Sequence, residues 1–154
     1  TYNRQCSQFV DSNRPMVSKA EIDGIYDMEK VIEEDWEWRR RGPNFEGEAT
    51  VYCLNEDLNL TLKAWKRRSY GFCLLYKSSK VIRRWDTSTP HTNPDGEVIS
   101  EPHKHYWTEE HEDGFAYPVD DVATDDVHQA FMDFLDECNI ELRGTYQTGL
   151  NDHD

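Results

Sequence analysis

The sequence predicts an α+β fold, with an N-terminal helix, a twisted antiparallel β-meander and an amphipathic C-terminal helix packed on one face of the sheet. Two observations lead to this class. A helical pattern comes first, several strand patterns follow one another directly, and a second helical pattern closes the chain. The segments between the strand patterns are too short to hold the helical crossovers that parallel strands need. The chain, 1–154, is expected to form a single domain whose core is rich in aromatic residues, which make up 12% of the sequence.

The two helices are predicted from their caps and from the spacing of their apolar residues. The first runs from Ser18 to about Glu34, because Ser18 and Glu21 have the form of a capping box and an apolar stripe follows. Thr124 is expected to be the N-cap of the second helix. The stripe of this second helix should lie on the apolar face of the sheet. Its members are Val127, Ala130, Phe131, Phe134, Leu135 and Cys138.

Short segments rich in β-forming residues, separated by turn signals, predict a meander of five or six strands. The clearest alternation runs from Leu58 to Ala64, where apolar and polar residues take turns and one face is apolar. A last edge strand is expected to end at Pro118. The predicted strands cover residues 49–54, 58–64, 72–76, 81–85, 103–107 and 115–119.

The two ends of the chain carry no clear pattern. Residues 1–17 are expected to be a leader or loop that docks on the body, and residues 143–154 a polar tail. No apolar run is long enough to cross a bilayer and the N-terminus has no signal core, so the sequence predicts a cytoplasmic protein without membrane contact. The scattered cysteines are expected to be buried free thiols. They are Cys6, Cys53, Cys73 and Cys138.

The net charge of −14 argues against an undifferentiated nucleic-acid binder, but the charge is unevenly distributed. Between Arg39 and Arg84 there are eleven Lys and Arg against four acidic residues, and the rest of the chain is strongly acidic. This predicts one positive face, the alternative being that these residues are simply solvated on strand surfaces. Core or edge packing is favoured over base stacking for four tryptophans. These are Trp36, Trp38, Trp65 and Trp107.

Three of the six histidines lie in one polar stretch that is interrupted by Pro, Asn and Gly residues, as expected of a loop. His103 and His105 alternate along a short strand, so both should point to one face. With His91 across the loop and Asp86 or Asp95 nearby, the three imidazoles would form an open site for a divalent metal. No known metal-binding signature is present, so metal-dependent catalysis is one of two candidate mechanisms.

The other candidate is metal-free acid–base chemistry on a phosphodiester. Two histidines can act as general base and general acid while a third assists, an aspartate orients an imidazole, and cationic side chains hold the phosphate. The predicted acid–base pair is His91 and His103, with His105 assisting and Asp86 orienting an imidazole. The phosphate-binding candidates are Arg84 and Lys104.

A structural role is the alternative to both chemistries. In that case each histidine would bond separately to a backbone carbonyl with the side chains pointing apart, and Asn93 and Asp95 would form Asx turns. Convergence would instead place the imidazoles within about 10 Å of one another, around one shared group. Arg84 and Asp86 share a strand face and could pair, either in support of a neighbouring histidine or as a surface ion pair worth under about 1 kcal/mol.

One pattern consists of Arg84-x-Asp86, His91-x-Asn93-Pro94-Asp95-Gly96 and Pro102-His103-x-His105, followed by an Asp-led helix that ends in Phe134-Leu135-x-x-Cys138-Asn139-Ile140. With this pattern the C-terminal half of the chain resembles an uncharacterised family of small bacterial proteins. A looser pattern consists of Arg84-Trp85-Asp86, Pro90-His91 and Pro102-His103-x-His105. It is similar to that of TumE-like proteins, the presumed toxins of toxin–antitoxin pairs, and this resemblance implies a toxin-like activity on RNA.

The sequence therefore predicts a small toxin-like enzyme of a toxin–antitoxin or phage-conflict system that cleaves RNA by His-mediated phosphoryl transfer. A divalent metal is a candidate cofactor, and the expected partners are RNA and a cognate antitoxin or another protein. The alternative comes from a different class. It is a non-catalytic acidic binding protein, such as an antitoxin, an immunity protein or a phage-borne inhibitor, which would present carboxylates to a basic partner and use the histidine loop as a scaffold.

Overall fold

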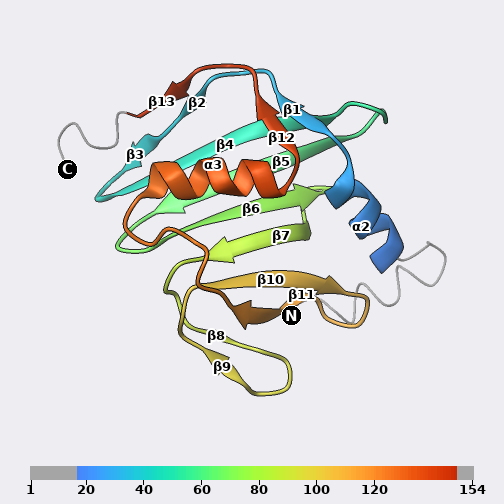
Figure 1. The fold of residues 1–154 in the computed structure, drawn as a ribbon, viewed down its shortest axis with the longest axis vertical. Coiled ribbons are helices and arrows are strands. Elements are labelled where there is room, and N and C mark those ends of the chain that lie inside the picture. The colour runs from blue at the N-terminus through green and yellow to red at the C-terminus, as the bar shows by residue number, and fades with distance from the viewer. Residues whose placement is uncertain (1–16, 149–154) are drawn as a thin grey trace.

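A computed structural model describes residues 17–148, in which a large twisted sheet carries one helix across its face and a second, shorter helix beside it (Figure 1). The helices are α2 (Lys19–Asp27) and α3 (Val127–Glu137). The main sheet is formed by β1 (Lys30–Ile32), β3 (Arg39–Arg41), β4 (Asn44–Cys53), β5 (Asn59–Lys66), β6 (Tyr70–Tyr76), β7 (Lys80–Asp86), β10 (His103–Thr108), β11 (Glu112–Pro118) and β12 (Ile140–Leu142). Two smaller sheets are formed by β2 (Trp36–Glu37) with β13 (Tyr146–Gln147), and by β8 (His91–Thr92) with β9 (Val98–Ile99).

The predicted α+β class and antiparallel meander are confirmed. The sheet order is β11-β10-β7-β6-β5-β4-β1-β12, with β3 also paired to β4, and every neighbour from β4 to β11 is antiparallel. The sheet is larger than the five or six strands expected, because β1 and β12 extend it with a parallel pair. These two short segments come from opposite ends of the chain, so no local pattern announces their pairing.

The N-terminal helix begins where predicted but ends earlier. The Ser18 hydroxyl accepts a hydrogen bond from the backbone N–H of Glu21 at 3.0 Å, yet α2 ends at Asp27 rather than near Glu34. The following residues enter β1, where Ile32 is fully buried. Since β1 lies between β4 and β12, its backbone has a neighbouring strand on both sides.

A buried lysine joins the ends of the two helices. The Lys30 ammonium donates hydrogen bonds of 2.7–2.8 Å to the carbonyls of Tyr26, Met28 and Cys138. These carbonyls lie at the C-terminal ends of α2 and α3, where helices leave acceptors unsatisfied. Burial lowers the pKa of Lys30 from its usual range, and the three carbonyls compensate for the water that the ammonium loses. No local sequence pattern predicts this role for Lys30.

Helix α3 packs on the sheet through the stripe that the sequence predicts. All six members of that stripe are buried. The Phe131 ring lies 4.5 Å from that of Trp36, and the Phe134 ring lies 5.2 Å from that of Trp85, measured between centroids. Edge and tilted contacts of this kind stabilise an aromatic core beyond the area that they bury.

The N-cap of α3 is Asp126, so the prediction of Thr124 is wrong by two residues. Asp126 has an extended backbone, and its side chain accepts a hydrogen bond from the N–H of Gln129 at 3.1 Å. Both residues are of a type that caps helices. The one that does so is the residue directly before Val127, the first apolar residue that the helix buries.

Part of the predicted polar tail is structured. β13 pairs in parallel with β2, and the Tyr146 ring stacks on Phe131 with 5.2 Å between centroids. The segment predicted to be a leader lies outside the described residues apart from Val17, as do residues 149–154.

Three of the cysteines are buried free thiols, as predicted, and Cys6 lies outside the described residues. The packing interpretation is confirmed for Trp36 and Trp107, which are buried in the core. No helix among residues 17–148 is long and apolar enough to cross a membrane.

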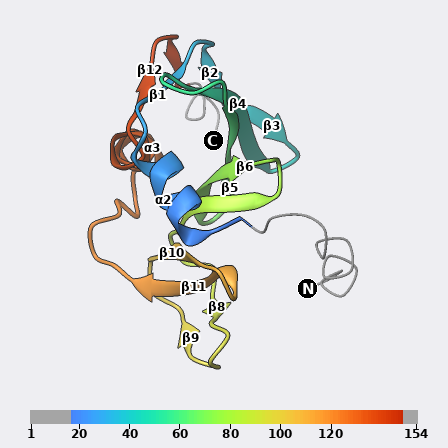
Figure 2. The same ribbon diagram turned by 90° about the vertical axis from the view of Figure 1, so that its right-hand side faces the viewer.

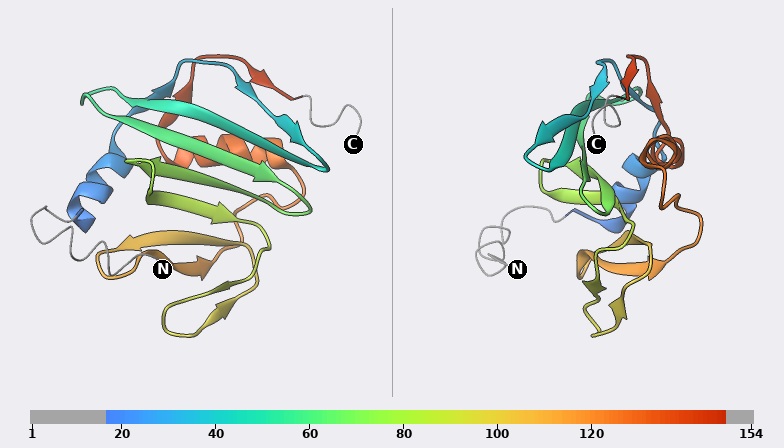
Figure 3. Two further views of the ribbon diagram at one scale, coloured as in Figure 1. Left: turned by 180° about the vertical axis from the view of Figure 1, so that it is seen from behind. Right: turned by 90° about the vertical axis from the view of Figure 1, so that its left-hand side faces the viewer.

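The two faces of the main sheet differ in what covers them. α3 lies across one face (Figures 1 and 2), toward which Phe72 and Trp85 point. Because side chains alternate along a strand, the residues next to them point to the opposite face. Figure 3 shows this opposite face from behind, with α3 on the far side. We call it the open face, and it carries the candidate site.

Candidate functional site

Two neighbouring strands bring four of the predicted site residues together. In the antiparallel pair of β7 with β10, His103 lies opposite Asp86 and His105 lies opposite Arg84. All four occupy alternate positions of their strands, so their side chains share the open face. The period-2 spacing of the histidines therefore predicted their common direction correctly.

The β8–β9 hairpin adds the third histidine. Its turn places Gly96 at a φ of 95°, a conformation that glycine adopts without strain. Asn93, expected in an Asx turn, instead uses its amide to donate to the carbonyl of Ala116 and to accept from the N–H of Ala116, at 3.0 and 2.8 Å. This pair of bonds fixes the hairpin to β11 and holds His91 beside the strand histidines.

The three imidazoles converge. Ring centroids are 4.5 Å apart for His91 and His105, 5.1 Å for His103 and His105, and 6.0 Å for His91 and His103. Each ring also bonds to a backbone carbonyl, as a bracing role requires. The acceptors are Glu101 for His103, Asp113 for His105 and Gly114 for His91, at 2.7–2.9 Å. The histidines therefore bond to backbone carbonyls, as expected of a structural role, and also lie together, as expected of a functional site.

An ionised carboxylate lies at the centre of this cluster. The Asp86 side chain is 3% exposed, and its Oδ2 lies 3.6 Å from Nε2 of His103, 3.4 Å from Nε2 of His105 and 2.9 Å from Nε of Arg84. Burial alone would raise the pKa of Asp86, but contact with His105 and the charge of Arg84 outweigh it and lower the pKa. Burial lowers the pKa of His103, which favours a neutral imidazole.

Three of these side chains have the arrangement of metal ligands. In the described part of the chain, one ligand atom each from Asp86, His103 and His105 lies within 4.8 Å of the others, and all three residues are buried. His91 stands next to this group without belonging to it. Asp95, the other carboxylate proposed, is exposed on the hairpin turn, where it accepts the N–H of Glu97.

Lys104 is not part of the site, which corrects its assignment as a phosphate-binding residue. It lies between the two strand histidines and therefore points to the α3 side. Its ammonium donates to Glu137 at 2.8 Å and to Asp121 at 3.1 Å, and its side chain is only 6% exposed. The alternation that places the histidines together also directs Lys104 away from them.

Exposure separates the site residues into two groups. His103 and His105 are 0% and 3% exposed, so in this conformation neither touches solvent to any useful extent. Arg84 has 35% of its side chain exposed, and His91 is half-buried. The guanidinium of Arg84 also lies 5.3 Å from the ring centroid of Trp65. Arg84 and His91 are thus the groups through which a solute would meet the cluster.

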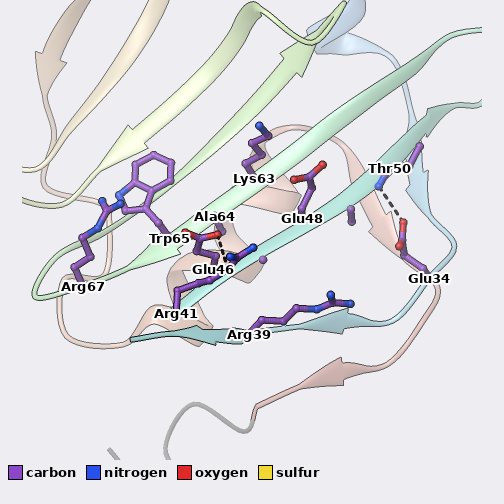
Figure 4. Close-up of a pocket in the computed structure, with 12 residues that line it drawn as sticks. Glu34, Arg39, Arg41, Glu46, Glu48, Thr50, Lys63, Ala64, Trp65 and Arg67 are labelled. Carbon is purple, nitrogen blue, oxygen red and sulfur yellow. Dashed lines mark hydrogen bonds and ion pairs between the residues drawn. The ribbon is translucent and has the colours of Figure 1, made fainter. Parts of the chain in front are cut away.

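A hollow of about 600 Å³ lies further along the sheet, lined from β3, β4, β5 and the loop after β5 (Figure 4). It contains none of the histidines. Arg39, Lys63 and Arg67 line it without an ion-pair partner among the described residues, and Glu46 pairs with Arg41 at 3.5 Å. The predicted segregation of basic residues is thus present here in part, mixed with acidic side chains.

Sequence reasoning did not find that Trp65, which lines the hollow, also contacts Arg84 of the site. The Trp65 indole lies over Gly71, where any Cβ would collide with it, and Gly71 is paired with Asp86 across β6 and β7. Glycine inside a strand often marks such a close approach. This was the signal in the sequence that could have linked Trp65 to the site.

Comparison with known proteins identifies a family. No curated protein and no solved structure matches the chain. A family model described as "Family of unknown function (DUF6978)" matches residues 17–140, which include both helices and the whole histidine cluster. The chain therefore belongs to this family of unknown function, DUF6978.

Proposed function

We propose that the protein is a toxin-like enzyme that cleaves RNA by phosphoryl transfer at the histidine cluster. One observation carries the proposal: three imidazoles, a carboxylate and an arginine from three strands meet at one place on the open face. General acid–base groups beside a cation that can hold a phosphate are what this reaction needs. The loose similarity to TumE-like toxins supports RNA as the substrate.

Differences in burial support one assignment of roles within the cluster. His91 is the histidine that substrate can reach, and its Nε2–H donates to Gly114, so its Nδ1 carries a lone pair. In the reaction the 2′-hydroxyl of RNA gives its proton to His91 and attacks phosphorus. The bond to the 5′-oxygen breaks, and that oxygen takes a proton from water. Arg84 binds the phosphoryl oxygens, and His103, buried behind them, is a positioning residue rather than the general acid.

The neighbouring basic side chains support this substrate. Arg39, Lys63 and Arg67 line the hollow without ion-pair partners among the described residues, and Trp65 connects the hollow to Arg84. Unpaired cations attract a phosphate backbone, and an aromatic side chain can stack a base. A single-stranded RNA could run from the hollow toward the cluster.

The test is cleavage of a fluorescent single-stranded RNA and growth arrest on expression. We expect His91→Ala to lower the cleavage rate by about 10²–10⁴-fold, the range for losing one acid–base group. Arg84→Gln should lower the cleavage rate and also raise KM, because Arg84 binds the phosphoryl oxygens. The matched controls are His111→Ala and Arg143→Gln, which change a half-buried histidine and an exposed arginine outside the cluster. Cleavage by His91→Ala at the parental rate would refute the assignment.

A non-catalytic binding protein is the second candidate, and it also has an observation in its favour. Every imidazole of the cluster donates to a backbone carbonyl, so the cluster can serve as a rigid brace. The net charge of −14 would then attract a basic partner. This candidate predicts no RNA cleavage by the parent protein, together with loss of folding stability in the same His91→Ala variant.

A further inference from the structure

We propose that Asp86, His103 and His105 bind one divalent transition-metal ion, with Zn²⁺ the best match. This inference goes beyond the proposed RNA cleavage, because the site is defined by its own geometry and can be tested without any substrate. The three residues come from β7 and β10, whose register places His103 opposite Asp86, with His105 two residues further along β10 on the same face.

The hydrogen bonds of the two histidines fix where their lone pairs point. Nδ1 of His103 faces the carbonyl of Glu101, and Nδ1 of His105 faces the carbonyl of Asp113. A carbonyl oxygen only accepts, so in both rings the proton of the neutral form is on Nδ1. The Nε2 atom of each neutral ring therefore presents a lone pair toward Asp86.

This leaves the centre of the cluster with acceptors and too few donors. Both Nε2 atoms are buried and have no hydrogen-bond partner of acceptable geometry. They face a carboxylate oxygen, which is also an acceptor, so the neutral rings and the ionised carboxylate repel one another unless a proton or a metal cation lies between them. The Arg84 guanidinium donates to Asp86, but it does not reach either imidazole nitrogen with a hydrogen bond.

The two separations measured from the carboxylate oxygen fit a tetrahedral ion, and all three ligand atoms lie within 4.8 Å of one another. Ligands held at about 2.0–2.1 Å from zinc at tetrahedral angles lie about 3.4 Å apart, whereas at right angles they would lie about 2.9 Å apart. The observed distances from Oδ2 of Asp86 to the two Nε2 atoms are 3.4 and 3.6 Å. Two imidazoles with one carboxylate are a known zinc donor set, which leaves a fourth position for water.

The surroundings provide the support that metal-binding histidines need. A ligating imidazole usually donates its other N–H to a carbonyl or a carboxylate, which fixes the ring and its tautomer. Both histidines have such a partner on the backbone, and Arg84 donates to Oδ2 of Asp86, the same oxygen that faces the two imidazoles. His91, with its ring 4.5 Å from that of His105, stands at the side of the site.

The experiment measures zinc binding by the full chain. Protein stripped with a chelator should bind one Zn²⁺ per chain in calorimetry, and its melting temperature should rise with zinc concentration. Asp86→Asn and His105→Gln should each weaken the affinity by more than about 100-fold, since loss of a ligand exceeds the 10–100-fold effect of losing a supporting partner. The matched control, His111→Gln, changes a histidine outside the cluster and should bind zinc as the parent does.

A second measurement keeps the test valid if a buried variant fails to fold. X-ray absorption of the zinc complex of the unaltered protein should show two imidazole nitrogens and no sulfur, and Co²⁺ should give the intense visible bands of a tetrahedral site. No saturable binding by the stripped protein, sulfur ligation, or parental affinity in both variants would overturn the proposal. Zinc at this cluster supports the site whether or not RNA is cleaved, so the two proposals fail separately.

Discussion

The side chain of Asn93 forms the hydrogen bonds with the edge strand β11 that a neighbouring strand would otherwise form. The outer edge of β11 presents backbone groups that no strand of the main sheet pairs. The Asn93 amide occupies the N–H and the carbonyl of Ala116, which is the bonding pattern of one residue in an antiparallel ladder. Its buried position makes the two bonds matter, because neither backbone group has water to replace them.

Replacing Asn93 should therefore destabilise the protein. Asn93→Ala leaves a buried donor and a buried acceptor on Ala116 unpaired, and we expect a loss of about 2 kcal/mol in the free energy of unfolding. Urea denaturation followed by fluorescence would measure it. The control is Thr92→Ala, an exposed neighbour on the same hairpin, which should change stability by less than about 0.5 kcal/mol. Equal stabilities for the two variants would show that the amide does not hold the hairpin.

The residue scale also shows how far the site could be predicted. Strand alternation was enough to place His103 and His105 together, and the same alternation, applied to the residue between them, would have removed Lys104. The position of His91 could not be derived in this way, because it depends on how a loop folds back. That path is decided by the Asn93 amide and by a backbone carbonyl of β11, which a local pattern does not reveal.

At the scale of elements, prediction succeeded where an element carries its own pattern. α3 and the strands from β4 to β7 have apolar spacing of the correct period and were found. β1 was assigned to a helix, because Ile32 continues the apolar spacing of α2 and the pairing of β1 with β12 is not local. Short strands such as β13 exist only through a distant partner, and they were missed for the same reason.

The cap of α3 gives a prediction with an internal control. Asp126→Ala removes the side chain that accepts the N–H of Gln129, and we expect a loss of about 1 kcal/mol in the free energy of unfolding. Thr124→Ala, at the position that the sequence favoured, should change it by less than about 0.5 kcal/mol. Chemical denaturation of both variants would measure the difference, and a larger loss for Thr124→Ala would contradict the cap that the structure shows.

For the whole molecule, the most consequential charges are those inside it. Glu137 at the end of α3 accepts hydrogen bonds from Arg83, Trp85 and Lys104, and so links the helix to β7 and β10. Burial by itself would raise the pKa of Glu137, but the hydrogen bonds and charges of Arg83 and Lys104 outweigh it and lower the pKa to about 2. The many acidic side chains on the surface contribute less to folding stability, because exposed ion pairs are weak.

Stability should therefore depend on pH through Glu137. Because its pKa is lower in the folded than in the unfolded chain, its contribution is complete above about pH 4.5 and is lost as the pH falls toward about 2. The shift corresponds to about 3 kcal/mol as an order of magnitude. Glu137→Gln should be less stable than the parent at pH 7, and its free energy of unfolding should fall less steeply below pH 4.5.

Denaturant titrations of parent and variant at pH 7, 5, 4 and 3 measure this difference. Asp136→Asn is the matched control, since it removes an exposed carboxylate at the neighbouring position of the same helix. The carboxylates other than Asp136 and Glu137 are common to all three proteins, so the differences between their curves report on the substituted groups. Parallel curves for parent and Glu137→Gln would mean that the buried network gains nothing from this charge, and that Arg83 and Lys104 are held by packing alone.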